Sequence, residues 1–197
     1  MRIKKDRIII NNKSGFTLME VMVAVFLFAF LMIMVGSSFT LAQRSYNKGA
    51  TENELAQNIR VSLDRLTREI RQSVGIITIL PPNNTDPLNP PADELMIQDG
   101  HDISQITYIR YYLSSGNLSR RHFAYFFDEE PTVYVTYNAT DPYGNPPQEI
   151  VISDQIIGEY GSNLDFWGGS GQIFLTLELT KNNRTIKVDT TIFSRNE

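Results

Sequence analysis

Residues 16–35 read FTLMEVMVAVFLFAFLMIMV, and no polar side chain occurs between residues 21 and 35. With the GSSFTLA that follows, the apolar span reaches about 25 residues, whereas a bilayer core of roughly 30 Å needs about 20 helical residues. This segment is therefore long enough to cross a membrane as one helix.

The charge of the chain is distributed unevenly around this segment. The first fifteen residues carry five basic side chains and one acidic side chain, a local charge of +4, although the whole chain has a net charge of −4. Because positive residues favour the cytoplasmic side, we expect the N-terminus in the cytoplasm and everything after Thr40 outside. The residues after the first fifteen sum to a charge of −8, which disfavours a phosphate-binding surface, so no nucleic acid partner is expected.

Glu20 is the feature that neither a secretory signal peptide nor a plain membrane anchor explains. A signal peptide has an apolar region of only about 7 to 15 residues before small residues at the cut site, which Gly36, Ser37 and Ser38 imitate loosely. An ionised carboxylate within an apolar segment costs several kcal/mol unless it is paired. We therefore expect another group to neutralise Glu20.

Residues 13–24, KSGFTLMEVMVA, resemble the cleavage and methylation motif of type IV prepilins and type II secretion pseudopilins. The shared features are a basic residue, Gly15, a Phe-Thr-Leu run, Glu20 and a following apolar run. The resemblance implies that a membrane-embedded prepilin peptidase cuts between Gly15 and Phe16 on the cytoplasmic side. It also implies that the new α-amine of Phe16 is methylated and that the apolar helix stays on the mature protein.

Cleavage at this position would supply the partner that Glu20 needs. It would create an ammonium group on Phe16, about one helical turn from Glu20. The ammonium group and the carboxylate could pair within one chain or between neighbouring subunits. Pairing between subunits would neutralise both charges and fix the axial register of a filament, as the resemblance implies. Major pilins often carry a proline near Gly36, and its absence here favours a minor component.

The helix is expected to continue beyond the apolar segment. Apolar residues recur at helical spacing and form the stripe of an amphipathic helix: Leu55, Ile59, Leu63, Leu66, Ile70 and Val74. Charged residues fall off this stripe and are interpreted as a solvated face: Arg60, Asp64, Arg65, Arg68, Glu69 and Arg71. Since Gly36 and the two serines after it weaken a helix, we expect one long interrupted or bent helix over residues 16–73.

After Gly75 the pattern changes to the period of two that is typical of β-strands. The predicted strands are 76–80, 94–98, 105–113, 118–127, 132–137, 149–153, 172–181 and 185–194. Two hairpins are expected, one turning at residues 114–117 and one at Asn182 and Asn183. The proline-rich residues 81–91 are predicted to form a loop.

One long helix followed by a mostly antiparallel sheet predicts an α+β fold of the pilin kind. The expected parts are a cytoplasmic leader peptide (1–15), a transmembrane helix (16–40), its amphipathic continuation (41–74) and an extracytoplasmic β-rich head (75–197). The order of segments resembles the J-type minor pseudopilins. That resemblance implies I-type and K-type minor subunits, a major subunit, prepilin peptidase and an inner-membrane platform protein as partners.

The head offers few candidates for catalysis or for binding a cofactor. His101 and His122 lack a motif that pairs them with a nucleophile or a second ligand, so both are interpreted as surface histidines, and no enzyme activity is expected. The chain has no cysteine. No cofactor is predicted, but Asp141, Asp154 and Asp165 are an alternative set of calcium ligands, because hard oxygen ligands suit Ca²⁺. A Pro-Tyr-Gly-Asn turn explains the first of these aspartates without a metal.

These observations together predict a structural protein of the cytoplasmic membrane. We expect a minor pilin or pseudopilin subunit, processed by prepilin peptidase and assembled through its N-terminal helix into a type II secretion or type IV pilus-like filament, as an initiator at the tip. The alternative is a membrane-tethered extracytoplasmic binding module that enters no filament. Glu20 separates the two hypotheses, because a mere anchor gains nothing from an acid in its apolar segment.

Overall fold

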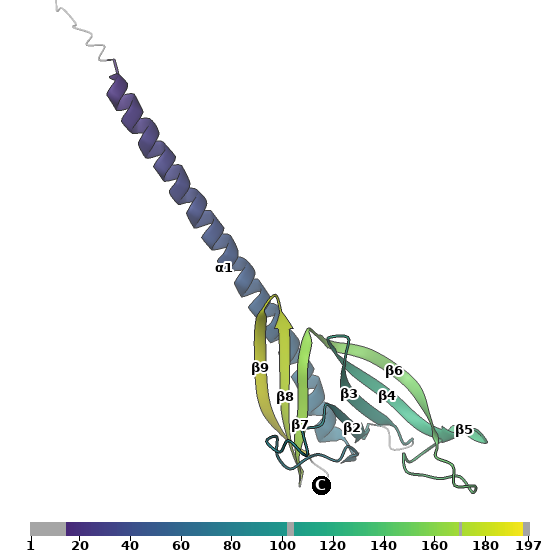
Figure 1. Cartoon of the computed structure of the whole chain (residues 1–197). Helices are drawn as coiled ribbons and strands as arrows, with labels where there is room; N and C mark the ends of the chain where they lie inside the picture. Colours follow the sequence, from purple (N-terminus) through teal and green to yellow (C-terminus); the bar gives the residue numbers. More distant parts are fainter. Residues whose placement is uncertain (1–14, 102–104, 170, 195–197) are drawn as a thin grey trace, which may run out of the picture. The chain divides into compact units, whose positions relative to one another are not determined.

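The computed structural model describes residues 15–101, 105–169 and 171–194, which contain one helix and nine strands (Figure 1). The chain divides into two compact units, Met1–Lys48 and Gly49–Glu197. The first unit holds the N-terminal part of the helix. The second holds the rest of the helix and all of the described strands.

Helix α1 (Leu18–Gln72) is 55 residues long and is not interrupted. Of the two expected alternatives at Gly36, Ser37 and Ser38, an interrupted or a bent helix, the interruption is therefore wrong. The Ser37 hydroxyl donates to the carbonyl oxygen of Ile33 at 2.8 Å, and the Thr40 hydroxyl donates to that of Ser37 at 2.9 Å. Both hydroxyls therefore find their acceptors within the helix itself.

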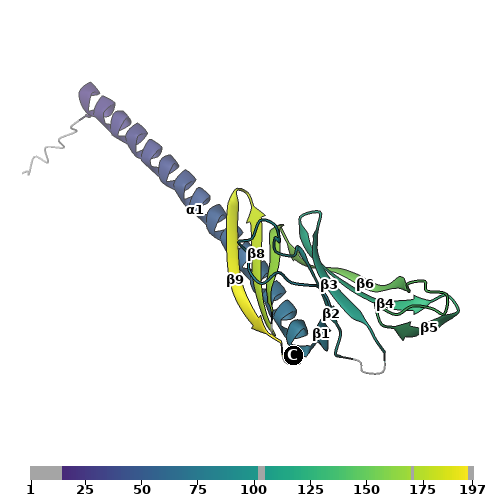
Figure 2. The same ribbon diagram turned by 60° about the horizontal axis from the view of Figure 1, so that its bottom comes forward.

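The strands of the second unit form two antiparallel sheets (Figures 1 and 2). The larger sheet has the order β1 (Gly75–Ile76), β2 (Glu94–Gln98), β3 (Tyr108–Ser114), β4 (Asn117–Phe127) and β5 (Glu130–Val135). A sixth strand of this sheet, β6 (Gln148–Glu159), also pairs with β4. The smaller sheet has the order β7 (Gly161–Gly169), β8 (Gln172–Lys181), β9 (Arg184–Phe193). The expected α+β architecture of the pilin kind is confirmed.

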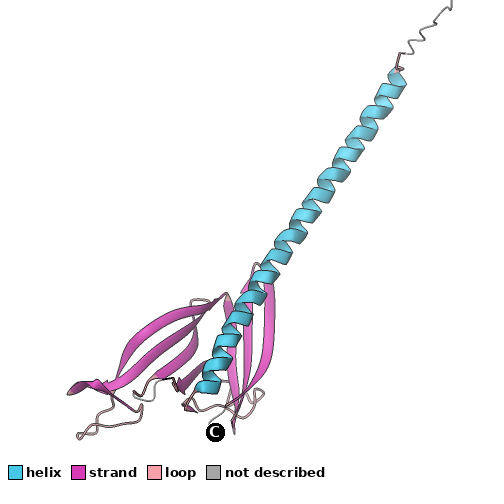
Figure 3. Ribbon diagram, turned by 180° about the vertical axis from the view of Figure 1, so that it is seen from behind, coloured by secondary structure: helices cyan, strands magenta, loops and turns pink. Residues whose placement is uncertain are grey.

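The main apolar core joins the C-terminal part of α1 to both sheets, and a smaller cluster contains Met96, Tyr108 and Phe123. Figure 3 shows this part of the helix lying across the strands. The helix contributes Leu55, Ile59, Leu66 and Ile70, and the strands contribute buried residues such as Leu95, Tyr111, Leu118, Phe166, Leu175 and Leu177. Most of the predicted stripe is thus confirmed, although Leu63 is only half-buried and Val74 is exposed beyond the end of the helix.

Both predicted hairpins are present, because their turn residues accept the backbone conformation that a tight turn requires. Asn182 and Asn183 have φ values of 50° and 59°, and Ser115 and Gly116 have φ values of 50° and 75°. Positive φ at both central residues is the signature of a two-residue type I′ turn, whose twist matches that of the flanking strands. The turns therefore set the registers of β3 with β4 and of β8 with β9.

Three strand predictions are corrected by the structure. The strand expected at 76–80 ends at Ile76, because the amides of Ile77 and Thr78 both donate to one carbonyl, that of Met96. The strand expected at 149–153 extends over Gln148–Glu159. Strand β7 was not predicted, because glycines at both ends leave only Leu164 and Phe166 as its buried apolar alternation.

Candidate functional site

The candidate site is the N-terminal end of α1, where Thr17 acts as the helix cap. The Glu20 amide donates to the Thr17 hydroxyl at 3.3 Å and to the Thr17 carbonyl at 3.1 Å, and the Val21 amide donates to the same carbonyl at 3.2 Å. A threonine that accepts from the amide three residues later is a typical N-cap, and a glutamate at that third position fits the spacing of a capping box. The helix therefore begins at Leu18 and leaves Phe16 just outside its first turn.

Glu20 lies in that first turn, where the positive end of the helix dipole favours a carboxylate. Of the residues that the structure describes, no basic side chain pairs with it. The helix terminus thus stabilises the charge in part and leaves the carboxylate available to a cation from elsewhere.

The surroundings of Glu20 are apolar and uncovered. All residues from 15 to 48 are exposed, among them large apolar side chains such as Phe16 at 81% and Phe26 at 72%. Soluble proteins rarely expose an apolar surface of this extent, so it requires lipid or other apolar helices around it. By length and composition, α1 contains a segment that can cross a membrane.

The comparison with protein families favours a processed N-terminus over a plain anchor. The prokaryotic N-terminal methylation motif matches residues 10–36, a range that includes Gly15, Phe16 and Glu20. The N-terminus of the chain is that of type IV pilin-like proteins. No curated protein matches the chain.

The pilin motif and the apolar helix together fit a single-pass protein anchored in a membrane. The motif also supports processing by a prepilin peptidase and, in general terms, contact with other pilin subunits. Proteins with this motif are structural and not enzymatic. The residues that match the motif lie in the part of the pilin-like chain where the capped first turn and Glu20 are found.

The three aspartates considered as calcium ligands are each engaged by protein groups. Asp141 closes a turn, since its carboxylate accepts from the amides of Tyr143 at 2.8 Å and Asn145 at 2.7 Å. Asp154 on β6 pairs with Arg121 at 2.9 Å, and Asp165 on β7 accepts from an asparagine amide at 2.6 Å. Within residues 15–101, 105–169 and 171–194, no group of three or more histidine, cysteine or acidic side chains is placed to hold a metal.

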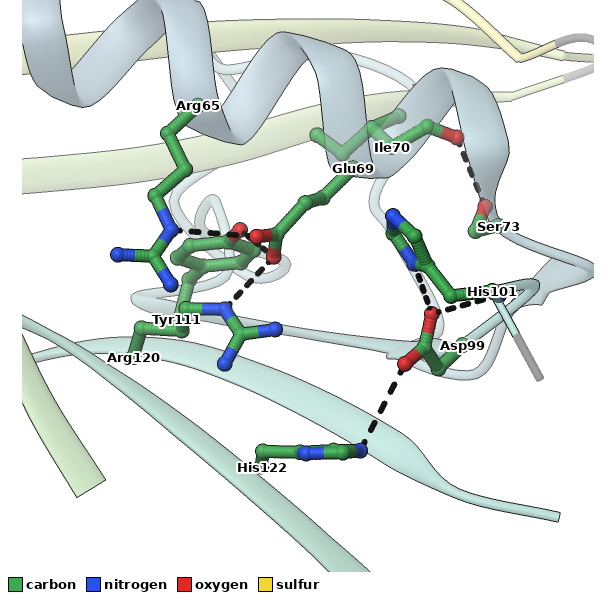
Figure 4. Close-up of polar contacts among 9 residues, drawn as sticks. All are labelled: Arg65, Glu69, Ile70, Ser73, Asp99, His101, Tyr111, Arg120 and His122. Atoms are coloured by element: carbon green, nitrogen blue, oxygen red, sulfur yellow. Dashed lines mark hydrogen bonds and ion pairs between the residues drawn. The ribbon is translucent and has the colours of Figure 1, made fainter. Parts of the chain in front are cut away.

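A buried ion pair in the head was missed by sequence reasoning. Glu69, expected on a solvated face, has a side chain only 8% exposed, and its carboxylate accepts from Arg120 at 2.7 Å, from Arg65 at 3.2 Å and from the Tyr111 hydroxyl (Figure 4). Burial alone would raise the pKa of Glu69, but the hydrogen bonds from Tyr111 and Arg120 outweigh it and hold that pKa below its usual value. The carboxylate is therefore ionised and links the helix to β3 and β4.

A second polar group near the end of α1 contains both histidines. The Asp99 carboxylate accepts from the His101 amide at 3.0 Å, and it lies 2.5 Å from Nδ1 of His101 and 3.6 Å from Nε2 of His122 (Figure 4). His101 is exposed as predicted, but the prediction for His122 is wrong, because its side chain is only 24% exposed. Burial lowers the pKa of His122, although the nearby Asp99 opposes this shift.

A signal for the buried glutamate was present in the helix pattern. The buried positions Leu55, Ile59, Ser62, Leu66 and Glu69 follow steps of four, three, four and three. This regular alternation selects Glu69 as well as Ile70 for the buried face. The hydroxyl of Ser62 is also used there, since it donates to the Ile157 carbonyl at 2.9 Å.

Proposed function

We propose that this pilin-like protein is a minor pilin or pseudopilin that assembles through its N-terminal helix into a type II secretion or type IV pilus-like filament. In this proposal, prepilin peptidase cuts between Gly15 and Phe16 and methylates the Phe16 amine. The observation that supports it is the carboxylate of Glu20, which lies in a fully exposed apolar segment without a cationic partner among the described residues.

The energetics favour a partner that appears only after cleavage. A carboxylate within a bilayer costs several kcal/mol when unpaired, although the helix terminus offsets part of this cost. An ammonium group about 4 Å away would contribute about 4 kcal/mol at an effective dielectric constant near 20. The amine of Phe16 is the nearest new cation, since Phe16 precedes the Thr17 cap and lies outside the hydrogen-bonded helix.

Pairing between subunits would explain assembly as well as charge neutralisation. An incoming subunit would place its Phe16 amine against the Glu20 carboxylate of a subunit already in the filament, so that the axial register is fixed by one ion pair. The exposed apolar side chains between residues 21 and 35 would then pack against neighbouring helices. Uncleaved precursor lacks the amine and would remain in the membrane.

Partners and location follow from the same proposal. The partners are other pilins or pseudopilins, including I-type and K-type minor subunits and a major subunit, together with prepilin peptidase and a platform protein. The protein would reside in the cytoplasmic membrane with its N-terminus inside, because the basic residues precede the apolar segment. The head, from residue 75 onward, would lie outside the cytoplasm.

The test separates processing from assembly. Glu20→Ala, Glu20→Gln and Glu20→Asp are expressed in the native host, with Met22→Ala as a control on the same exposed helix surface. Mass spectrometry of membrane-extracted protein is expected to show a methylated N-terminal Phe16 in every variant. Cross-linking and filament shearing are expected to show that the alanine and glutamine variants are not incorporated, whereas the aspartate and Met22→Ala variants are.

Two results would contradict the proposal. Normal incorporation of Glu20→Ala would remove the pairing role of the carboxylate. A membrane-extracted chain that still begins at Met1, or that has been cut beyond Val35, would favour the membrane-tethered binding module over a filament subunit.

A further inference from the structure

Strand β6 forms an open edge of the larger sheet. Within the described residues it pairs only with β4, so its other side presents unpaired backbone groups. At its C-terminal end the carbonyl of Ile157 is already bonded to Ser62 of the helix. The open part is therefore residues 148–156, called the β6 edge below.

The β6 edge exposes four apolar side chains and carries no basic residue or proline. Ile150, Val151, Ile152 and Ile156 are exposed by 40 to 62%, and the edge contains no lysine, arginine or proline. Proteins commonly place such residues on an open edge to prevent pairing with another chain. Register shifts near Ile152 and Ile157 leave regular runs at residues 148–151 and 153–156.

An open edge of the smaller sheet, on β9, shows the contrast within the same protein. Strand β9 carries Arg184 and Lys187 on exposed positions, and its neighbour β8 lies on one side only. Its exposed large apolar residue is Phe193, at the C-terminal end. Basic side chains along β9 therefore guard that edge, whereas the β6 edge carries no basic side chain.

Charge across the larger sheet indicates what kind of strand fits beside β6. Arg110 on β3 lies opposite Arg121 on β4, and Arg121 lies opposite Asp154 on β6. Arg110 pairs with Glu149 at 3.4 Å, and Arg121 pairs with Asp154 at 2.9 Å. Across these strands, an arginine on β3 and an arginine on β4 are followed by a carboxylate at the edge. A basic residue on a further strand would lie beside that carboxylate.

We infer that the β6 edge accepts an extended segment of another protein, in which β-branched residues alternate with lysine or arginine. The main chain of that segment would pair with β6. Glu149, Val151, Asp154 and Ile156 lie on one face of β6, and Ile150 lies on the other. The apolar side chains of the segment would lie on the face of Ile150. Its basic side chains would lie beside Glu149 and Asp154. Addition of a strand to an open edge is a recurring mode of peptide recognition.

A second copy of this chain fits the edge poorly. Residues 49–197 contain 20 acidic and 11 basic side chains, so two heads would meet with a charge of −9 each. The edge itself would bring only Glu149 and Asp154 to the contact, without a basic residue of its own. Like charges placed opposite each other across strands are destabilising.

The test uses the full chain in detergent and a fluorescent synthetic peptide, Thr-Lys-Val-Lys-Val-Lys-Thr, with Thr-Glu-Val-Glu-Val-Glu-Thr as the charge-reversed control. Fluorescence anisotropy is expected to show salt-sensitive binding of the basic peptide only. Hydrogen–deuterium exchange is expected to show slower exchange of amides within residues 148–156. Strand addition is independent of Glu20, so Glu20→Ala is expected to bind the peptide as the unmodified chain does.

Two matched variants locate the binding. Ile156→Lys on β6 and Phe193→Lys on β9 replace side chains that are 62% and 61% exposed with the same charge. Ile156→Lys is expected to weaken peptide binding about tenfold, because it places a cation against the basic strand, whereas Phe193→Lys is expected to leave binding unchanged. Absence of binding, protection outside residues 148–156, equal effects of the two variants, or a dimer in sedimentation that Ile156→Lys abolishes would each overturn the inference.

Discussion

Replacing Glu69 with leucine is expected to destabilise the head strongly, because it removes one member of a buried ion pair. The side chains of Glu69 and Arg120 are 8% and 9% exposed, and their atoms approach to 2.7 Å. In Glu69→Leu the Arg120 guanidinium stays buried without a counter-charge, and the Tyr111 hydroxyl loses its acceptor.

The magnitude follows from what remains behind. Breaking a buried pair by removing one partner costs about 3–5 kcal/mol. For a folded unit of this size, each kcal/mol shifts the melting temperature by about 2–4 °C, so a decrease on the order of 10 °C is expected. Replacing the whole polar group by Glu69→Met, Arg120→Met and Tyr111→Phe is expected to come within about 2 kcal/mol of the original stability, since no unpaired charge is left.

The fluorescence of Trp167, the only tryptophan of the chain, provides the assay. Trp167 stacks on Phe174 with ring centroids 5.7 Å apart, so its emission reports unfolding of the smaller sheet within the same unit. Thermal and urea unfolding of the full chain in detergent would give the melting temperature and the free energy of unfolding. Arg65→Gln is the control, because Arg65 contacts the same carboxylate from a side chain that is 33% exposed and is expected to cost less than about 1 kcal/mol.

The reasoning would be refuted by a loss below about 1 kcal/mol in Glu69→Leu, the range of an exposed pair. It would also be refuted if the triple replacement were as unstable as Glu69→Leu. In that case the defect would arise from packing and not from the unpaired charge.

Two further predictions concern the end of α1. Burial lowers the pKa of His122, so as pH falls below about 6.5 the unfolded chain takes up a proton before the folded one and the free energy of unfolding decreases. His122→Gln is expected to flatten this pH dependence of stability between about pH 7 and 5 in urea titrations. An unchanged slope of stability against pH would contradict the prediction. A Cβ added at Gly100 would clash with the backbone oxygen of Gln72, so Gly100→Ala is expected to lower the stability of the head by about 1–3 kcal/mol in a thermal melt. Gly49→Ala is the control. Its added Cβ meets nothing within 4 Å, so this variant is expected to raise the stability slightly.

The sequence by itself determined the features that depend on neighbouring residues. The apolar segment, its flanking charge and the motif around Gly15 and Glu20 are contiguous, so a pilin-like N-terminus could be predicted without a structure. The two hairpins were also predictable, because Asn183 and Gly116 accept positive φ in their turns. The residue-level roles of Gly15, Phe16 and Glu20 remain predictions for the experiments described above.

Only the tertiary structure decided which polar residues are buried and which strand edge stays open. Glu69 meets Tyr111 and Arg120 across 42 and 51 residues of sequence, and no local pattern encodes which distant arginine will neutralise a carboxylate. Likewise, the sequence of β6 does not indicate that this strand has a neighbour, β4, on one side only. The physical reason is that burial and pairing are properties of the packed core, where each group is stabilised or left exposed by residues that the chain brings together only on folding.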